Sequence, residues 1–178
     1  MSFEANRQVR TISGVAELRS QPFSNQWLLT GSSGPIARAI RYPRAHHSRV
    51  TLTDGTHWTL QPDGWGIVRA VENQVPFARA TRLGSRHWEI AGVAFAYDLV
   101  AAGMLGRNWR LRIGSAEVAS LRGNPLSFNR LRVEASLAVP VVAILLAWQV
   151  IARPWEYAAS APRMPRSERP GRPATKTT

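Results

Sequence analysis

Short segments of alternating apolar and polar residues fill the chain from Thr11 to Val133. Four of them share one theme: a polar residue is followed by Trp, by any residue and by Leu or Ile. These four segments are 26–29, 57–60, 87–90 and 108–111. Because side chains alternate between the two faces of a strand, each Trp shares a face with the aliphatic residue two positions later. The pattern predicts half-buried β-strands.

The alternation also predicts which side chains face inward. The predicted buried set is Trp58, Leu60, Trp88, Ile90, Trp109, Leu111 and Ile113, and the predicted exposed set is Thr59, Glu89, Arg110 and Arg112. A second theme, at 36–39 and 77–80, puts two alanines on one face and an arginine on the other. Small residues on an inner face allow another element to approach closely.

Turn residues separate these segments. Asp54-Gly55 and Asp63-Gly64 are typical turn pairs, and the latter leads into a strand expected at Trp65–Val71. The spacing predicts ten to twelve strands with almost no helical periodicity. A sheet of that size must close or stack to remove its edges.

One uncharged apolar run, Ala135 to Ala152, interrupts the strand pattern. As a helix, its 18 residues would extend about 27 Å, close to the roughly 30 Å bilayer core. Pro140 fits best in the first turn of a helix, however, which would shorten the regular part to roughly 20 Å. A helix that is apolar all round must be covered. We therefore expect helix 137–152 inside a closed sheet, with a single membrane span as the alternative.

The two ends of the chain differ from the middle. Residues 1–10 form a short lead-in with Glu4 and no apolar run, unlike a secretory signal peptide. Residues 11–152 form the predicted barrel domain. Residues 153–178 carry six Lys or Arg and five Pro, which predicts a disordered basic tail.

Paired strands with W-x-Φ and Φ-A-x-A segments, followed by one C-terminal apolar helix, resemble the tubby C-terminal-like superfamily, which includes the phospholipid scramblases and the LURP-one-related proteins. The resemblance covers about Thr11 to Ala152. It implies an all-β fold, a closed antiparallel barrel of about twelve strands around a central helix, and binding of membrane phosphoinositides through basic residues. The chain has no acidic calcium loop and no cysteine to palmitoylate, so calcium-activated scrambling is not implied.

Motifs for catalysis are missing from the sequence. Cysteine chemistry is excluded, and no nucleophile elbow, metal-binding histidine pair or phosphate-binding glycine loop occurs. We therefore expect no enzyme activity, no cofactor and no metal.

Basic residues are the remaining surface signal. Net charge is +12, and of the 23 basic residues only Lys176 is a lysine. Two sets are candidate contacts for anionic lipid, namely Arg38, Arg41, Arg44 and Arg49, and Arg107, Arg110 and Arg112. An arginine-rich solvated surface is the simpler explanation of both sets. Nucleic acid is an unlikely partner because no nucleic-acid-binding motif accompanies the charge and the tryptophans are expected in the core.

These features predict a non-enzymatic module that binds anionic membrane lipid, cytoplasmic and peripheral at the inner face of the membrane. The alternative is a single-pass β-domain protein with a structural or scaffold role. We expect a monomer, and the sequence does not identify a protein partner. Binding to anionic liposomes should weaken as salt rises.

Overall fold

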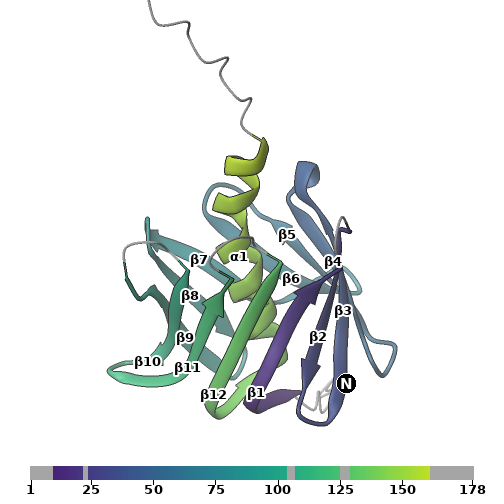
Figure 1. Cartoon of the computed structure of the whole chain (residues 1–178). Coiled ribbons are helices and arrows are strands. Elements are labelled where there is room, and N and C mark those ends of the chain that lie inside the picture. Colours follow the sequence, from purple (N-terminus) through teal and green to yellow (C-terminus); the bar gives the residue numbers. More distant parts are fainter. Residues whose placement is uncertain (1–9, 22–23, 104–106, 125–128, 161–178) are drawn as a thin grey trace, which may run out of the picture.

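We describe the protein from a computed structural model, which covers residues 10–21, 24–103, 107–124 and 129–160, with side chains up to residue 152. Within these residues, twelve strands close into one antiparallel barrel (Figure 1). Each strand pairs with its neighbours along the chain, and β1 pairs with β12 to close the ring. The predicted all-β barrel of about twelve strands is confirmed.

The strands are β1 (Thr11–Ser20), β2 (Gln26–Gly31), β3 (Gly34–Tyr42), β4 (His47–Leu52), β5 (His57–Pro62), β6 (Ile67–Glu72), β7 (Val75–Gly84), β8 (His87–Gly92), β9 (Phe95–Ala101), β10 (Asn108–Ile113), β11 (Ala116–Gly123) and β12 (Arg130–Pro140). A short 3-10 helix, η1 (Pro43–Ala45), joins β3 to β4, and the helix α1 (Val141–Ser160) follows β12.

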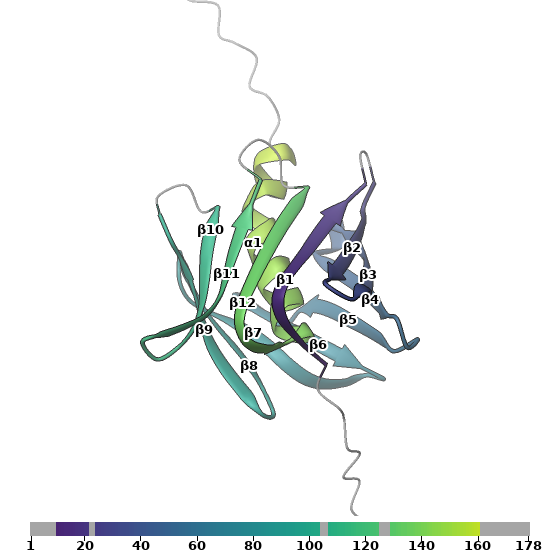
Figure 2. The ribbon, with the colours of Figure 1, turned by 60° about the horizontal axis from the view of Figure 1, so that its bottom comes forward.

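Helix α1 starts at one end of the barrel and runs through its interior (Figure 2). At its start, the Val141 N–H donates a hydrogen bond of 2.8 Å to the Arg10 carbonyl. Every side chain from Val141 to Ala152 is buried, and Leu146 is fully inaccessible to solvent. The predicted central helix is therefore confirmed. In the part of the chain that the structure describes, no helix is long and apolar enough to cross a membrane.

The helix boundaries differ from the predicted 137–152. Residues 137–140 belong to β12, where Pro140 pairs with Thr11 of β1. The helix also continues to Ser160, eight residues past the predicted end. The prediction ended the helix at residue 152 because the uncharged apolar run ends there, but the helical backbone continues beyond that run. The predicted disordered tail at 153–178 thus starts too early. Residues 1–9 of the lead-in and 161–178 of the tail lie outside the described residues.

The barrel interior combines large side chains with alanines. Trp27 of β2 packs edge-on against Trp148 of α1, with ring centroids 5.2 Å apart. The alanines of the repeated theme are buried as expected, and they are Ala37, Ala39, Ala78 and Ala80. Helix α1 packs against β6, β7, β8 and β12, so the small side chains of Ala78 and Ala80 on β7 leave room for it. Large and small side chains of the wall thus fill the space around the helix inside the barrel.

Most of the predicted strand orientations are confirmed. Leu60, Trp88, Ile90, Trp109 and Leu111 are buried, Trp58 is partly buried against the core, and Arg110 is exposed. Thr59, Glu89 and Arg112 are partly exposed. The prediction that Ile113 is buried was wrong, since this residue is 53% exposed. It ends β10 beside the Gly114 turn, after a bulge between Leu111 and Arg112 against β11.

Trp65 also departs from the expectation. It was predicted to start a buried strand, but β6 begins at Ile67 and Trp65 lies in the preceding loop, 86% exposed. The flanking residues Gly64 and Gly66 have φ angles of 78° and 73°, a region that glycine reaches without strain. The chain therefore turns at these two residues, and the tryptophan between them is not committed to the core.

The antiparallel order gathers alternate connections at each end of the barrel. We call one the helix-exit end, because α1 starts at the opposite end and leaves the barrel here (Figure 1). It carries the connections 43–46, 63–66 and 85–86 and the described parts of the connections 21–25, 102–107 and 124–129. The opposite end, the helix-start end, carries the turns 32–33, 53–56, 73–74, 93–94 and 114–115.

Candidate anionic-ligand site

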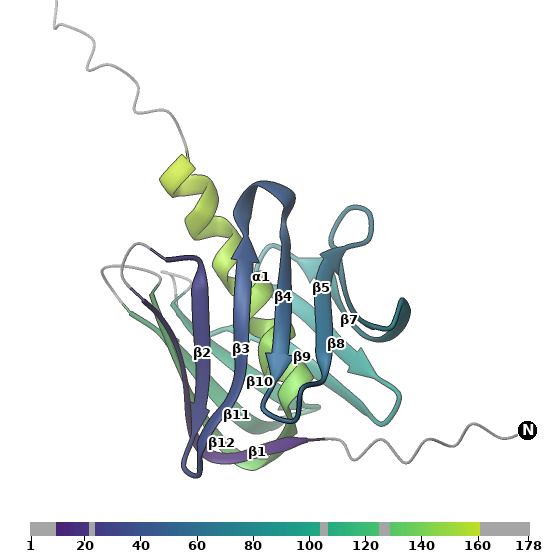
Figure 3. The ribbon, with the colours of Figure 1, turned by 90° about the vertical axis from the view of Figure 1, so that its right-hand side faces the viewer.

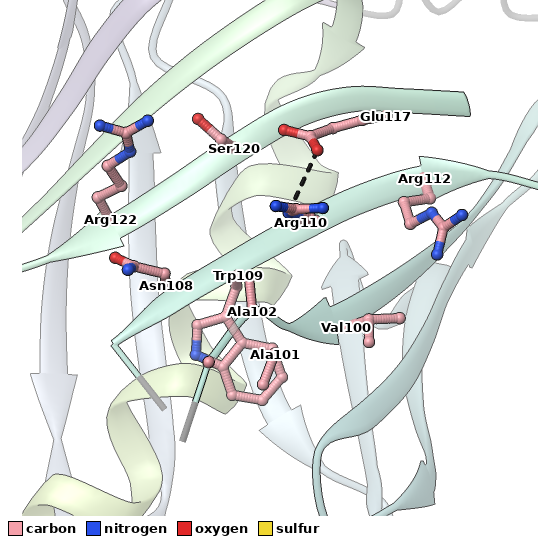
Figure 4. A pocket seen from close by; sticks show the side chains of 11 residues that line it. Val100, Ala101, Ala102, Asn108, Trp109, Arg110, Arg112, Glu117, Ser120 and Arg122 are labelled. Carbon is pink, nitrogen blue, oxygen red and sulfur yellow. Dashed lines mark ion pairs between the residues drawn. The ribbon is translucent and has the colours of Figure 1, made fainter. Parts of the chain in front are cut away.

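A polar groove crosses the outer wall of the barrel over β9, β10 and β11. Its volume is about 770 Å³. We call it the arginine groove, because Arg110, Arg112 and Arg122 line it (Figure 4). Glu117, Ser120 and Asn108 are among its other lining residues.

The register of the β10–β11 hairpin brings these side chains together. Asn108 pairs with Arg122, and Arg110 pairs with Ser120, so polar residues from both strands lie next to each other on the outer face. Strand alternation had predicted Arg110 and Arg112 on this face. Because both strands belong to a closed sheet, the groove has a wall fixed by backbone hydrogen bonds rather than by a loop.

The groove carries more positive than negative charge. The Arg110 Nε lies 3.3 Å from Glu117 Oε2 in an ion pair, and the Arg112 guanidinium donates to the Ser115 carbonyl at 3.1 Å. Arg122 is exposed and pairs with no carboxylate among the described residues. The lining contains three guanidinium groups and one carboxylate. Arginine donors of this kind match the oxygens of phosphate or carboxylate.

The second predicted set is partly assembled here. Arg110 and Arg112 both line the groove, whereas Arg107 precedes β10, is half-buried and is not part of the lining. The sequence reasoning missed Arg122. Pairing the segments on either side of the Gly114-Ser115 turn would have set it opposite Asn108, on the outer face.

The first predicted set is brought together only in part, because Arg38 and Arg49 are diagonal neighbours on the paired strands β3 and β4. Arg38 and Arg49 are exposed on the outer faces of β3 and β4, the strands in front in Figure 3, and Arg44 is exposed in η1 at the helix-exit end. Arg49 contributes to a second hollow of about 510 Å³ with His47 and Thr59. Its guanidinium also lies 5.7 Å from the centre of the Tyr42 ring.

Arg41 lies inside the barrel, only 4% exposed, so the prediction that it contacts lipid is wrong. It is an odd number of residues from Arg38 on the same strand, which turns it to the inner face. Its guanidinium lies 5.1 Å from the Trp148 ring and donates to the side-chain and backbone oxygens of Gln149 at 3.4 Å each. Arg41 therefore holds the helix in the barrel.

Comparison with known proteins gives one informative likeness. No family model matches the chain. No curated protein matches it either. An X-ray structure of a protein from Arabidopsis thaliana superimposes with a TM-score of 0.53 at 11% sequence identity, over 81% of this chain and 92% of that chain. The Arabidopsis protein is a LURP-one-related, tubby-like barrel, and at this identity the likeness concerns the fold alone.

Proposed function

We propose that this chain is a non-enzymatic module that binds anionic lipid at a membrane surface, with a headgroup phosphate held in the arginine groove. The observation that carries the proposal is Arg122, an exposed guanidinium without a carboxylate partner among the described residues. It lies in the same groove as Arg112 and the Ser120 hydroxyl. Guanidinium groups and a hydroxyl offer the donors that a phosphate monoester or diester accepts.

Two further features support this proposal. The net charge of +12 attracts the protein to surfaces that carry anionic lipid. The fold is similar to a tubby-like barrel, and the superfamily resemblance implies phosphoinositide binding. The corresponding location is the cytoplasm, peripheral at the inner face of the membrane. A membrane-spanning role for α1 is not proposed, because Val141 to Ala152 are buried in the barrel.

Flotation with purified full-length protein tests the function. Vesicles that contain phosphatidylserine or a phosphoinositide should carry the protein to the top of the gradient, and phosphatidylcholine vesicles should not. Binding should weaken as added salt shortens the Debye length from about 10 Å at 0.1 M to about 3 Å at 1 M. At constant ionic strength, inorganic phosphate should compete only weakly if the ligand is a lipid headgroup, and strongly if it is free phosphate. Equal flotation with both kinds of vesicle would contradict the proposal.

A further inference from the structure

The exposed indole of Trp65 is held on an ordered turn. The Asp63 N–H donates to the Ile67 carbonyl at 3.0 Å, and the Arg82 N–H of β7 donates to the Gly66 carbonyl at 2.8 Å. The Arg82 guanidinium lies 5.3 Å from the centre of the Trp65 ring. These contacts present a large apolar side chain to solvent in a fixed position. An indole beside a cation suits a surface that is apolar below and charged above.

Further apolar and basic side chains lie at the same end of the barrel. Leu83, next to Arg82 near the end of β7, is 56% exposed. Arg86 and Arg44 are exposed in the connections 85–86 and 43–46. In the described parts of the connections at the helix-exit end, the sole carboxylate is Asp63, which pairs with Arg69 at 2.5 Å. This end therefore carries uncompensated positive charge around a tryptophan.

The opposite end has a different character. Its turns, 32–33, 53–56, 73–74, 93–94 and 114–115, contain no Lys or Arg. Asp54, whose pKa is lowered chiefly by the Thr56 N–H that donates to it, lies there in an ion pair with Arg10, the residue before β1, so the charge of Arg10 is compensated. Val93 and Val75 are exposed at this end, but no cation accompanies them in these turns. Charge complementarity with anionic lipid thus selects the helix-exit end and not the helix-start end.

We infer that the helix-exit end docks on an anionic bilayer, with Trp65 and Leu83 at headgroup depth and Arg44, Arg82 and Arg86 on lipid phosphates. Tryptophan is enriched at this depth in membrane proteins, and arginine at the surface is attracted to anionic headgroups. The inference rests on the proposed lipid binding and adds the orientation of the barrel. Ala102 and Gly103, at the described start of the connection 102–107, line the arginine groove, so one end of the groove lies at the helix-exit end; its other end reaches Arg112, which donates to the 114–115 turn.

Two cysteine variants can measure this orientation, because the chain has no native cysteine. Ser85→Cys is at the helix-exit end and Ser33→Cys at the helix-start end, and both serines are exposed in turns. Each variant is labelled with an environment-sensitive fluorophore and mixed with phosphatidylserine vesicles. We expect a blue shift and a rise in emission from the label at position 85 and no change at position 33.

A further substitution tests whether Trp65 itself contributes to membrane binding. Trp65→Ala should lower the affinity for phosphatidylserine vesicles about tenfold, because burial of a large apolar side chain is lost on the membrane. Val93→Ala removes an exposed apolar side chain at the opposite end and should leave affinity unchanged. The circular dichroism of both variants should match that of the parent protein.

The outcomes separate the orientation from the binding itself. If the protein floats with anionic vesicles but the label at position 33 responds, or neither label does, the orientation is overturned and the proposed function stands. Unchanged affinity of Trp65→Ala overturns the role of the tryptophan. If the unlabelled protein fails to float, the proposed function fails and the orientation fails with it.

Discussion

The Ser48 hydroxyl of β4 donates a hydrogen bond of 2.7 Å to the side-chain oxygen of Gln149 on α1, in the interior of the barrel. The Gln149 amide nitrogen donates in turn to the His46 carbonyl at 3.2 Å, and Arg41 donates to the same side-chain oxygen. One glutamine on an otherwise apolar stretch of helix thus supplies partners for polar groups of the wall. Buried polar groups need such partners, so this glutamine fixes the register of the helix against β3 and β4.

Gln149→Leu should destabilise the protein. The substitution keeps an apolar volume but removes the hydrogen bonds that the Gln149 side chain makes with the Ser48 hydroxyl, the His46 carbonyl and the Arg41 guanidinium. Each buried group left unpaired costs about 1–3 kcal/mol, and a charged group costs more. Chemical denaturation should report a loss of at least about 2 kcal/mol in the free energy of unfolding. Gln61→Leu, the same change at an exposed position on β5, should alter it by about 0.5 kcal/mol or less.

Leu146→Ala tests the contribution of the central helix to the core. Leu146 is fully buried, so truncating it leaves a cavity between α1 and the wall. We expect a loss of about 2–5 kcal/mol in the free energy of unfolding. Leu137→Ala is the matched control, because that leucine lies on β12 and is 57% exposed. Equal losses in the two variants would contradict a helix packed inside the barrel.

The fold could be predicted because its signals are local. Alternation along each segment defines the strands, turn pairs such as Asp54-Gly55 separate them, and closure follows from the number of strands. A helix that is apolar on all sides has to be surrounded by other elements, and alanines on the inner face of the sheet indicated that the barrel has space for such a helix. The end of the helix could not be predicted in this way, because nothing in the apolar pattern marks where the backbone stops being helical.

The candidate site was only partly accessible from the sequence. Arg110 and Arg112 could be assigned to the outer face by alternation, but Arg122 joins them through the pairing of two strands, which a residue-by-residue pattern does not contain. Arg41 was grouped with Arg38 by proximity in sequence, although the odd spacing separates them across the wall. Trp65 was misjudged because the Asp63-Gly64 pair was read as the end of the turn and Trp65 as the first strand residue, whereas Gly66 also has a positive φ and the turn extends past the tryptophan.

Alkaline pH should destabilise the protein through Tyr97. Burial raises the pKa of this phenol above its ordinary value of 10.0. As pH rises above about 10, the phenol ionises in the unfolded chain while it stays neutral in the folded protein, so the free energy of unfolding falls. Tyr97→Phe removes this contribution. Between pH 8 and 11, the free energy of unfolding from denaturation curves should therefore decline less for Tyr97→Phe than for the parent protein. Equal declines in the two proteins would argue against a contribution from Tyr97.

The arginine groove predicts a position-specific effect of charge on lipid binding. Arg122→Ser removes the guanidinium that has no carboxylate partner among the described residues, whereas Arg110→Ser also frees the Glu117 carboxylate to repel an anion. Because each arginine that reaches the headgroups contributes about 1 kcal/mol, Arg122→Ser should weaken binding to phosphatidylserine vesicles about fivefold. Arg110→Ser should weaken it more. Titration of vesicles against each variant measures the two dissociation constants.

Arg79→Ser is the matched control for these variants, because it lowers the net charge by the same amount from an exposed position on the outer face of β7. If binding depends on overall charge alone, Arg79→Ser and Arg122→Ser should weaken it equally. A headgroup seated in the groove predicts that Arg79→Ser changes the dissociation constant by less than about twofold at 0.15 M salt, where the Debye length is about 8 Å and charges on other parts of the wall are screened. Equal losses of affinity in the two variants would show that the lipid does not bind in the groove and that only the net charge contributes.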